Sequence, residues 1–212
     1  MRLNIDLTQG KKIVNIYFTS DFHLFHKNVL KFDNRPFENV EEMHGEIEKK
    51  WNETVTNDDI VIYLGDLSFA RREETKFVDE MLYRLNGKIH FVMGNHDKIE
   101  EIRKLPRFES VQDYLELRVT HNVDSELHIG SKVKIETLFC IMHYPIYSWN
   151  KKHHGSYMVH GHCHMGLSES EHHSKNRIID VGCMGYEYTP ISYKEVIEKL
   201  KGVNYLISSN HH

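Results

Sequence analysis

Aspartate, asparagine and histidine residues recur in this sequence directly after short apolar runs, often beside a glycine. Seven of them carry side chains that bind metal ions: Asp21, His23, Asp66, Asn95, His143, His162 and His164. Carboxylate, imidazole and amide groups without a thiolate suit Mn²⁺, Fe or Zn²⁺. Seven candidate ligands exceed what one tetrahedral ion takes. They match two ions if one carboxylate bridges, and two ions about 4 Å apart form a clamp for phosphoryl transfer.

Two pairs of these residues are separated by a single position, Asp21 with His23 and His162 with His164. In an extended chain, residues i and i+2 point to the same side, so each pair is expected to bind one ion together. By the same rule, Cys163 should point away from its flanking histidines and act as a small buried residue.

Each motif has an ordinary structural interpretation when it is taken alone. Asp-x-His or Gly-Asp after a strand is usually a solvated turn. The run Gly161-His162-Cys163-His164 would supply half of a structural zinc site, but no Cys-x-x-Cys accompanies it. All the motifs together, in this order and at strand ends, favour a functional site.

Short apolar runs must position these residues. Six of them are typical of buried strands and cover residues 13–19, 59–64, 88–93, 137–142, 157–160 and 177–181. Ligands gather outside the carboxyl ends of strands in open α/β sheets. The candidate ligands follow five of these runs, so we expect them to meet at one place.

Three segments have the periodicity or the cap of a helix. The first has apolar residues at three- and four-residue spacing: Val40, Met43, Ile47, Trp51 and Val55. The second repeats this spacing at Phe77, Met81 and Leu85, before Gly87. The third begins with a capping box of Ser192 and Glu195 and ends before Gly202.

The second half of the chain favours strands. Residues 114–137 alternate in polarity, and Gly130-Ser131 suits a tight hairpin turn. No repeat, low-complexity tract or Pro/Gly linker divides the sequence, so we expect a single domain over residues 1–212. A β-α-β-α-β first half followed by strands predicts an α/β sandwich with mixed sheets.

Composition narrows the function classes. Of 212 residues, 40% are apolar and 11% aromatic, which is enough for a real core and excludes a disordered chain. The 27 Lys and Arg against 31 Asp and Glu give a net charge of −4, so no basic field indicates a nucleic-acid partner. No apolar stretch is long enough for a membrane-spanning helix, so we expect no membrane partner.

We expect a cytoplasmic protein. Asp6 lies where a signal peptide would carry its apolar region. Three cysteines cannot all pair internally, which favours a reducing compartment. His211 and His212 are either native residues or the remnant of a tag.

The motifs together carry a resemblance to a known family. The series Asp21-x-His23, Gly65-Asp66, Gly94-Asn95-His96-Asp97, His143 and Gly161-His162-x-His164 resembles the calcineurin-like metallophosphoesterase superfamily. More narrowly, His26-Lys27-Asn28, Arg35-Pro36-Phe37, Trp51-Asn52 and Pro190-x-Ser192 resemble a compact, phage-associated bacterial branch of predicted phosphoesterases. The resemblance implies a four-layer α/β/β/α sandwich, in which helices flank two mixed β-sheets and a two-metal site lies at the strand ends.

The resemblance also implies a division of the ligands. One metal would be held by Asp21, His23 and His164, and the other by Asn95, His143 and His162, with Asp66 bridging the two. We expect two divalent ions, with Mn²⁺ the first candidate and Fe, Zn²⁺ and Ni²⁺ the others.

His96 has no ligand role in that pattern. A metal-bridging hydroxide would attack phosphorus in line, and His96 would donate a proton to the leaving oxygen. Asp97 would orient the His96 imidazole, or else cap the helix that follows. His26, Asn28 and Arg35 are candidates for substrate contacts, Arg35 as a bidentate phosphate clamp or simply as a surface arginine.

The sequence departs from some family members. Their protein Ser/Thr phosphatases carry Gly-Asp-x-x-Asp-Arg-Gly, whereas Gly65-Asp66 is followed here by Leu-Ser-Phe-Ala. We therefore expect hydrolysis of phosphodiester or phosphomonoester bonds in a small molecule or nucleotide, with no stable nucleic-acid partner and the oligomeric state open. The alternative is a non-catalytic metal-binding module, structural or nucleic-acid-docking. A non-ligating His96 beside a ligand asparagine argues against that alternative.

Overall fold

The structure of the protein is a computed structural model that describes residues 1–8, 14–124, 132–168, 170–201 and 203. The predicted turn at Gly130-Ser131 lies outside these residues, as do Gly202 and the pair His211 and His212.

One sheet has the strand order β10-β2-β3-β4-β5. Its members are β2 (Ile16–Thr19), β3 (Ile60–Tyr63), β4 (Lys88–Val92), β5 (Phe108–Gln112) and β10 (Ile191–Ser192). The strands β2 to β5 are parallel to one another, and β10 pairs with β2 in the antiparallel sense. The carboxyl ends of β2, β3 and β4 therefore lie next to one another at the same edge of the sheet.

The other sheet has the strand order β1-β6-β7-β8-β9. Its members are β1 (Arg2–Asp6), β6 (Tyr114–Asp124), β7 (Lys132–Met142), β8 (Tyr157–His160) and β9 (Ile178–Asp180). The pair β6 and β7 is antiparallel, and the remaining pairs are parallel. Both sheets are thus mixed, as predicted.

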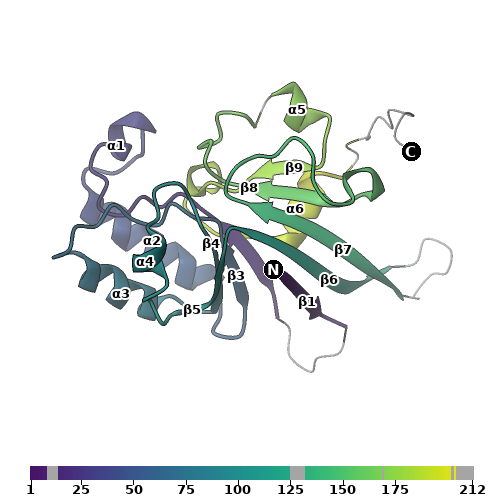
Figure 1. Cartoon of the computed structure of the whole chain (residues 1–212), viewed down its shortest axis with the longest axis horizontal. Coiled ribbons are helices and arrows are strands. Elements are labelled where there is room, and N and C mark those ends of the chain that lie inside the picture. Colours follow the sequence, from purple (N-terminus) through teal and green to yellow (C-terminus); the bar gives the residue numbers. More distant parts are fainter. Residues whose placement is uncertain (9–13, 125–131, 169, 202, 204–212) are drawn as a thin grey trace.

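Helices flank the sheets (Figure 1). They are α1 (Val29–Phe32), α2 (Val40–Thr54), α3 (Thr75–Arg84), α4 (Ile99–Ile102), α5 (Glu171–Ser174) and α6 (Tyr193–Lys199), with 3₁₀ turns η1 (Lys152–His154) and η2 (Cys183–Tyr186). In Figure 1, α1 to α4 lie on the side of β3, β4 and β5, and α5 lies beyond β8 and β9.

Apolar residues of the two sheets pack face to face. Phe18 and Ile62 of one sheet belong to the same buried cluster as Leu117 and Phe139 of the other. Because side chains alternate along a strand, the neighbouring residues of β2 and β3 face the opposite way and pack against α2 and α3. On the outer face of the other sheet, Cys140 packs against Trp149, which precedes η1. The α/β sandwich of two mixed sheets flanked by helices is confirmed.

The apolar stripe of α3 differs from the prediction at one position. The buried residues of this helix are Val78, Met81 and Leu82, whereas Phe77 is 38% exposed. The ring of Phe77 packs edge-on against Phe25, with the ring centroids 5.3 Å apart. Phe77 therefore lies at the flank of the stripe and not at its centre.

Among the described residues, no helix combines the length and the apolar character needed to cross a bilayer.

Candidate metal centre

The predicted ligands meet where the carboxyl ends of the strands converge. Backbone bonds join the loops that carry them: the N–H of Asp21 donates to Gly65 O at 3.0 Å, and the N–H of Gly161 donates to His143 O at 3.0 Å. A further bond joins the two sheets, because the N–H of Cys183 donates to Ser20 O at 3.1 Å. The site is therefore built from loops of both sheets.

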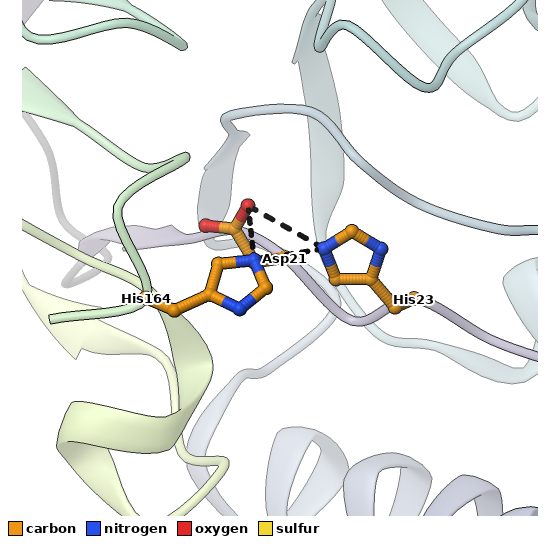
Figure 2. A group of neighbouring side chains, drawn as sticks. All are labelled: Asp21, His23 and His164. Carbon is orange, nitrogen blue, oxygen red and sulfur yellow. Dashed lines mark hydrogen bonds and ion pairs between the residues drawn. The ribbon is translucent and has the colours of Figure 1, made fainter. Parts of the chain in front are cut away.

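Asp21, His23 and His164 form the first cluster (Figure 2). Nε2 of His23 lies 2.9 Å from Nε2 of His164. Oδ1 of Asp21 lies 3.6 Å from Nε2 of His164 and 3.9 Å from Nε2 of His23. Figure 2 shows these three side chains directed at one point, Asp21 and His23 from the loop after β2 and His164 from the loop after β8.

Asp66, His143 and His162 form the second cluster, and Asn95 joins it. Oδ1 of Asn95 lies 3.1 Å from Nε2 of His143 and 2.8 Å from Nδ1 of His162. Oδ2 of Asp66 lies 3.4 Å from Nε2 of His143.

Asp66 faces both clusters. Its Oδ2 lies 3.4 Å from His143 Nε2 in the second cluster and 3.7 Å from His23 Nε2 in the first. Its Oδ1 accepts the backbone N–H of His96 at 2.9 Å, which fixes the orientation of the carboxylate. One carboxylate oxygen thus lies between the two groups.

In their neutral forms, two of the converging rings present acceptor atoms to the centre. Nδ1 of His143 lies 2.6 Å from the carbonyl of Leu64, and Nδ1 of His164 lies 2.9 Å from both carboxylate oxygens of Asp33. Since those oxygens only accept, the proton of each neutral ring is on Nδ1, and Nε2 presents a lone pair to the cluster. Lone pairs and carboxylates directed at one point repel unless a cation lies among them. The donor set therefore fits divalent metal ions.

Burial and neighbouring charged groups set the pKa values of the side chains in this site. It raises the pKa of the Asp21 carboxyl to about 6 and lowers the pKa of His23 to about 3. Burial would also lower the pKa of His143, but the hydrogen bond and charge of Asp66 more than offset it and raise that pKa. A bound cation would stabilise the charged form of the carboxylates, which burial disfavours, and the neutral form of the imidazoles.

The backbone at the ligands is left-handed and not extended. The φ angles are 60° at Asp21, 51° at His23, 56° at Asp66, 67° at His162 and 45° at His164. The extended geometry that we predicted for Asp21 with His23 and for His162 with His164 is therefore wrong. Asp21 and His23 do meet in the first cluster, but His164 lies in the first cluster and His162 in the second, so our prediction that these two histidines bind one ion together is also wrong. Non-glycine residues in this region each cost about 1–3 kcal/mol and cluster at functional sites.

Gly161 allows two of the loops to approach closely. A Cβ added at this position would lie 2.6 Å from Oδ2 of Asp21. The backbone N–H of the next residue, His162, donates to Asp21 Oδ1 and Oδ2 at 3.2 and 3.1 Å. A side chain at residue 161 would displace the carboxylate from the first cluster.

Asp97 lies elsewhere than we expected. Its Oδ2 accepts the backbone N–H groups of Asp66 and Gly94 at 2.8 Å each, and its Oδ1 accepts that of Leu67 at 3.0 Å. Lys98 is the cap residue of α4. Asp97 thus ties the loop after β3 to the loop after β4 and braces Asp66, whereas we predicted that it orients the His96 ring or caps a helix.

The other predicted site residues lie around this centre. His96 is exposed, belongs to neither cluster, and has its ring centroid 5.7 Å from that of His23. The ring of His26 lies 5.9 Å from that of His23. Asn28 is exposed and precedes α1.

Comparisons with known proteins place the chain in a family. The family model described as calcineurin-like phosphoesterase matches residues 14–189. The chain belongs to this family. It is 33% identical to an uncharacterised protein, MJ1445, of Methanocaldococcus jannaschii over 88% of this chain and 91% of that protein.

Two further comparisons agree. The Gene 66 protein of Mycobacterium phage L5 is 25% identical over 77% of this chain and 84% of that protein, in accord with the resemblance to a phage-associated branch. The crystal structure of AQ665 from Aquifex aeolicus, a protein of unknown function, matches with a TM-score of 0.63. It is 22% identical and covers 88% of this chain and 99% of that chain, so it supports the fold.

The sequence motifs did not identify Asp33, which lies beside the first cluster. Its carboxylate accepts from His164 Nδ1 at 2.9 Å and from Arg35 Nη2 at 2.9 Å. Burial acts to raise the pKa of Asp33, but the hydrogen bonds and charges of His164 and Arg35 together outweigh it and lower this pKa. No fixed spacing connects Asp33 to the metal motifs, so the sequence held no signal for it.

Arg35 supports this arrangement from within the protein. Its side chain is buried, and its guanidinium donates to the carbonyls of Phe22 and Asp21 at 2.8 and 2.9 Å as well as to Asp33. These bonds engage the groups that we expected to clamp a substrate phosphate. Arg35 is also not the surface arginine that we considered as the alternative, because its side chain is buried.

A third group of potential metal ligands lies among the described residues. It contains His160, Cys163 and Asp180. Asp180 accepts the backbone N–H of Met165 at 3.0 Å, and His160 Nε2 lies 2.7 Å from His173 Nε2. These hydrogen bonds brace the loop that carries His162 and His164.

Proposed function

We propose that this protein is a cytoplasmic two-metal phosphoesterase that hydrolyses phosphodiester or phosphomonoester bonds of a small molecule or nucleotide. The observation that carries the proposal is the position of Asp66, whose Oδ2 lies 3.4 and 3.7 Å from a histidine of each cluster. A purely structural metal site needs no second cluster that shares a carboxylate with the first.

Seven side chains would hold the ions. Asp21, His23 and His164 would bind one, Asn95, His143 and His162 the other, and Asp66 both. Two divalent ions, Mn²⁺ in the first instance and Fe, Zn²⁺ or Ni²⁺ otherwise, would supply an activated water and offset the charge on the phosphoryl group.

His96 would assist the leaving group. Its backbone N–H is bonded to the bridging Asp66, and its ring is exposed and outside both clusters. The imidazole is thus held beside the centre without being used as a ligand. A protonated ring in this position donates its proton to the leaving oxygen as the phosphorus–oxygen bond breaks. Asp97 would act indirectly, by bracing the loop of Asp66.

Two variants test these roles. Asp66→Asn should weaken metal binding at both sites, because it removes the charge that both ions share. His96→Ala should keep the full metal content but lower kcat by about 10²–10⁴-fold. The loss should be smaller for a p-nitrophenyl ester, whose leaving group needs little protonation, than for a nucleoside ester. His154→Ala, a change at an exposed histidine in η1, is the matched control.

The test is to measure the metal content of each variant by elemental analysis, together with its kcat on the p-nitrophenyl ester and on the nucleoside ester. Absence of turnover of every phosphoester by the fully metal-loaded protein would leave only a metal-binding module. Loss of metal in His96→Ala, or equal slowing of both substrates, would remove His96 from the role of proton donor.

A further inference from the structure

A cavity of about 420 Å³ adjoins the candidate metal centre. It lies between the loops that follow β3 and β4 and the helices α3 and α4. Its apolar lining consists of Leu67, Phe69, Ala70, Val78, Ile102 and Leu105. A volume of this size suits a small organic group.

The cavity is continuous with the metal centre on the side of His96. Asn95 and His96 both line it, the first a candidate ligand and the second the proposed proton donor. In an in-line displacement the leaving oxygen lies opposite the attacking one. The group attached to the leaving oxygen therefore extends past His96, in the direction of this cavity.

Polar groups of the lining are engaged with the backbone or with each other. The two charged residues of the lining, Lys98 and Glu101, pair with one another at 3.2 Å and are both exposed to solvent. Ser68 Oγ accepts the N–H of Ala70 at 2.9 Å, and Thr75 Oγ1 donates to the carbonyl of Arg72 at 2.5 Å. The carboxylate of Asp97 accepts backbone N–H groups. Such a wall favours an apolar group, because a group rich in hydroxyls would lose its bonds to water on entry.

Phe69 gives the entrance an aromatic character. Its ring stacks on His26 with the centroids 4.2 Å apart and the planes at 21°, and it lies 4.7 Å from the ring of His96. An incoming ring can pack beside these ring systems as it enters the cavity.

We propose that this cavity binds an aromatic ring carried by the leaving alcohol, so that the preferred substrates are phosphoesters of aryl-bearing or nucleobase-bearing alcohols. This inference rests on the proposed function for the direction of the leaving group. Phe69, Ala70 and Leu105 are then specificity-determining residues, and they lie outside both metal clusters.

Non-hydrolysable phosphonates test the proposal by binding. Calorimetry on the Mn²⁺-loaded protein would compare 2-phenylethylphosphonate with ethylphosphonate, which differ only in the ring. Burial of the ring should make the phenyl compound bind about 10- to 100-fold more tightly. Ala70→Phe, which fills the cavity, should abolish this difference and leave the affinity for ethylphosphonate within about threefold. Tyr83→Ala, at an exposed position of α3, is the control.

A second variant keeps the test valid if the larger side chain of Ala70→Phe distorts the loop after β3. Leu105→Ala enlarges the cavity and should shift the preference from a phenyl toward a naphthyl phosphonate. An adenine-bearing phosphonate distinguishes a nucleobase from a simple aryl group as the natural occupant. Equal affinity for the phenyl and ethyl compounds in the unchanged protein, or an unchanged preference in both variants, overturns the proposal. Ring-selective binding without hydrolysis of any ester would instead refute the phosphoesterase function and leave the cavity assignment intact.

Discussion

Replacing Asp33 with asparagine should selectively weaken one of the two proposed metal sites. Both carboxylate oxygens of Asp33 lie 2.9 Å from Nδ1 of His164. This contact fixes the proton on Nδ1, increases the basicity of Nε2 and directs Nε2 toward Asp21 and His23. An asparagine offers one neutral acceptor in place of two charged ones, so the ring would lose both its orientation and part of its basicity.

The magnitude follows from the kind of contact. Partners that orient a ligand histidine are typically worth 10- to 100-fold in metal affinity, or about 1.4–2.7 kcal/mol. A hydrogen bond to a charged group contributes about 1.5–3 kcal/mol, which agrees. Asparagine is preferable to alanine here, because alanine would leave the buried guanidinium of Arg35 without a side-chain oxygen partner.

Titration of metal-free protein with Mn²⁺ by calorimetry is the assay. We expect the affinity of one site to fall 10- to 100-fold, that of the other to change less than threefold, and kcat to recover at saturating Mn²⁺. Asp113→Asn, an exposed carboxylate in the connection between β5 and β6, is the control. Equal weakening of both sites, or none in a folded variant, would refute the role of Asp33.

Four further predictions can be tested, three from the structure and one from the sequence. Gly161→Ala should lose metal and about 1–3 kcal/mol of stability by thermal melting, because its Cβ would lie 2.6 Å from the Asp21 carboxylate. Gly45→Ala, on α2 with open space at Cβ, should stabilise the protein by about 0.5–1 kcal/mol. Burial lowers the pKa of His173 to about 4 from 6.5, so the unfolded chain binds more protons between these values. Stability in urea should therefore fall by about 1–2 kcal/mol as the pH drops from 6.5 to 4, and less so in His173→Gln. Bis(p-nitrophenyl) phosphate should be hydrolysed faster than p-nitrophenyl phosphate with Mn²⁺, since the sequence lacks the Asp-Arg-Gly run of the protein phosphatases; a faster monoester would contradict this.

The strands that carry the site were predictable because they are buried on both faces. An uninterrupted apolar run such as Ile60–Tyr63, followed at once by Gly65-Asp66, identifies both the strand and its functional end. The strand β1 was missed because it lies at the edge of its sheet and has polar residues at alternate positions, such as Arg2 and Asn4. β5 at the other sheet's edge was missed for a related reason, since none of its residues is fully buried.

The supporting contacts were not predictable from local patterns. Asp33 and His164 are 131 positions apart, and their contact depends on how the two sheets meet. Asp97 lies beside His96 in sequence, which suggested a contact between the two side chains. Its carboxylate instead reaches the backbone of residues 66 and 67 in another loop. Spacing along the chain identifies ligands that share a short loop, but it carries no information about groups that orient them from a distant loop.

The left-handed backbone at Asp21, His23, Asp66, His162 and His164 connects folding to metal binding. Each of these positions costs conformational free energy, and burial of Asp21 and Asp66 costs solvation free energy as well. Hydrogen bonds from Ser20, His162 and His96 to these two carboxylates offset part of that cost. A bound cation would offset the rest of this free-energy cost, because its positive charge would attract the lone pairs and carboxylates at the centre. The loops thus hold these side chains in an arrangement that suits a divalent cation. His96 belongs to neither cluster, which is why the proposed mechanism can assign it to the substrate.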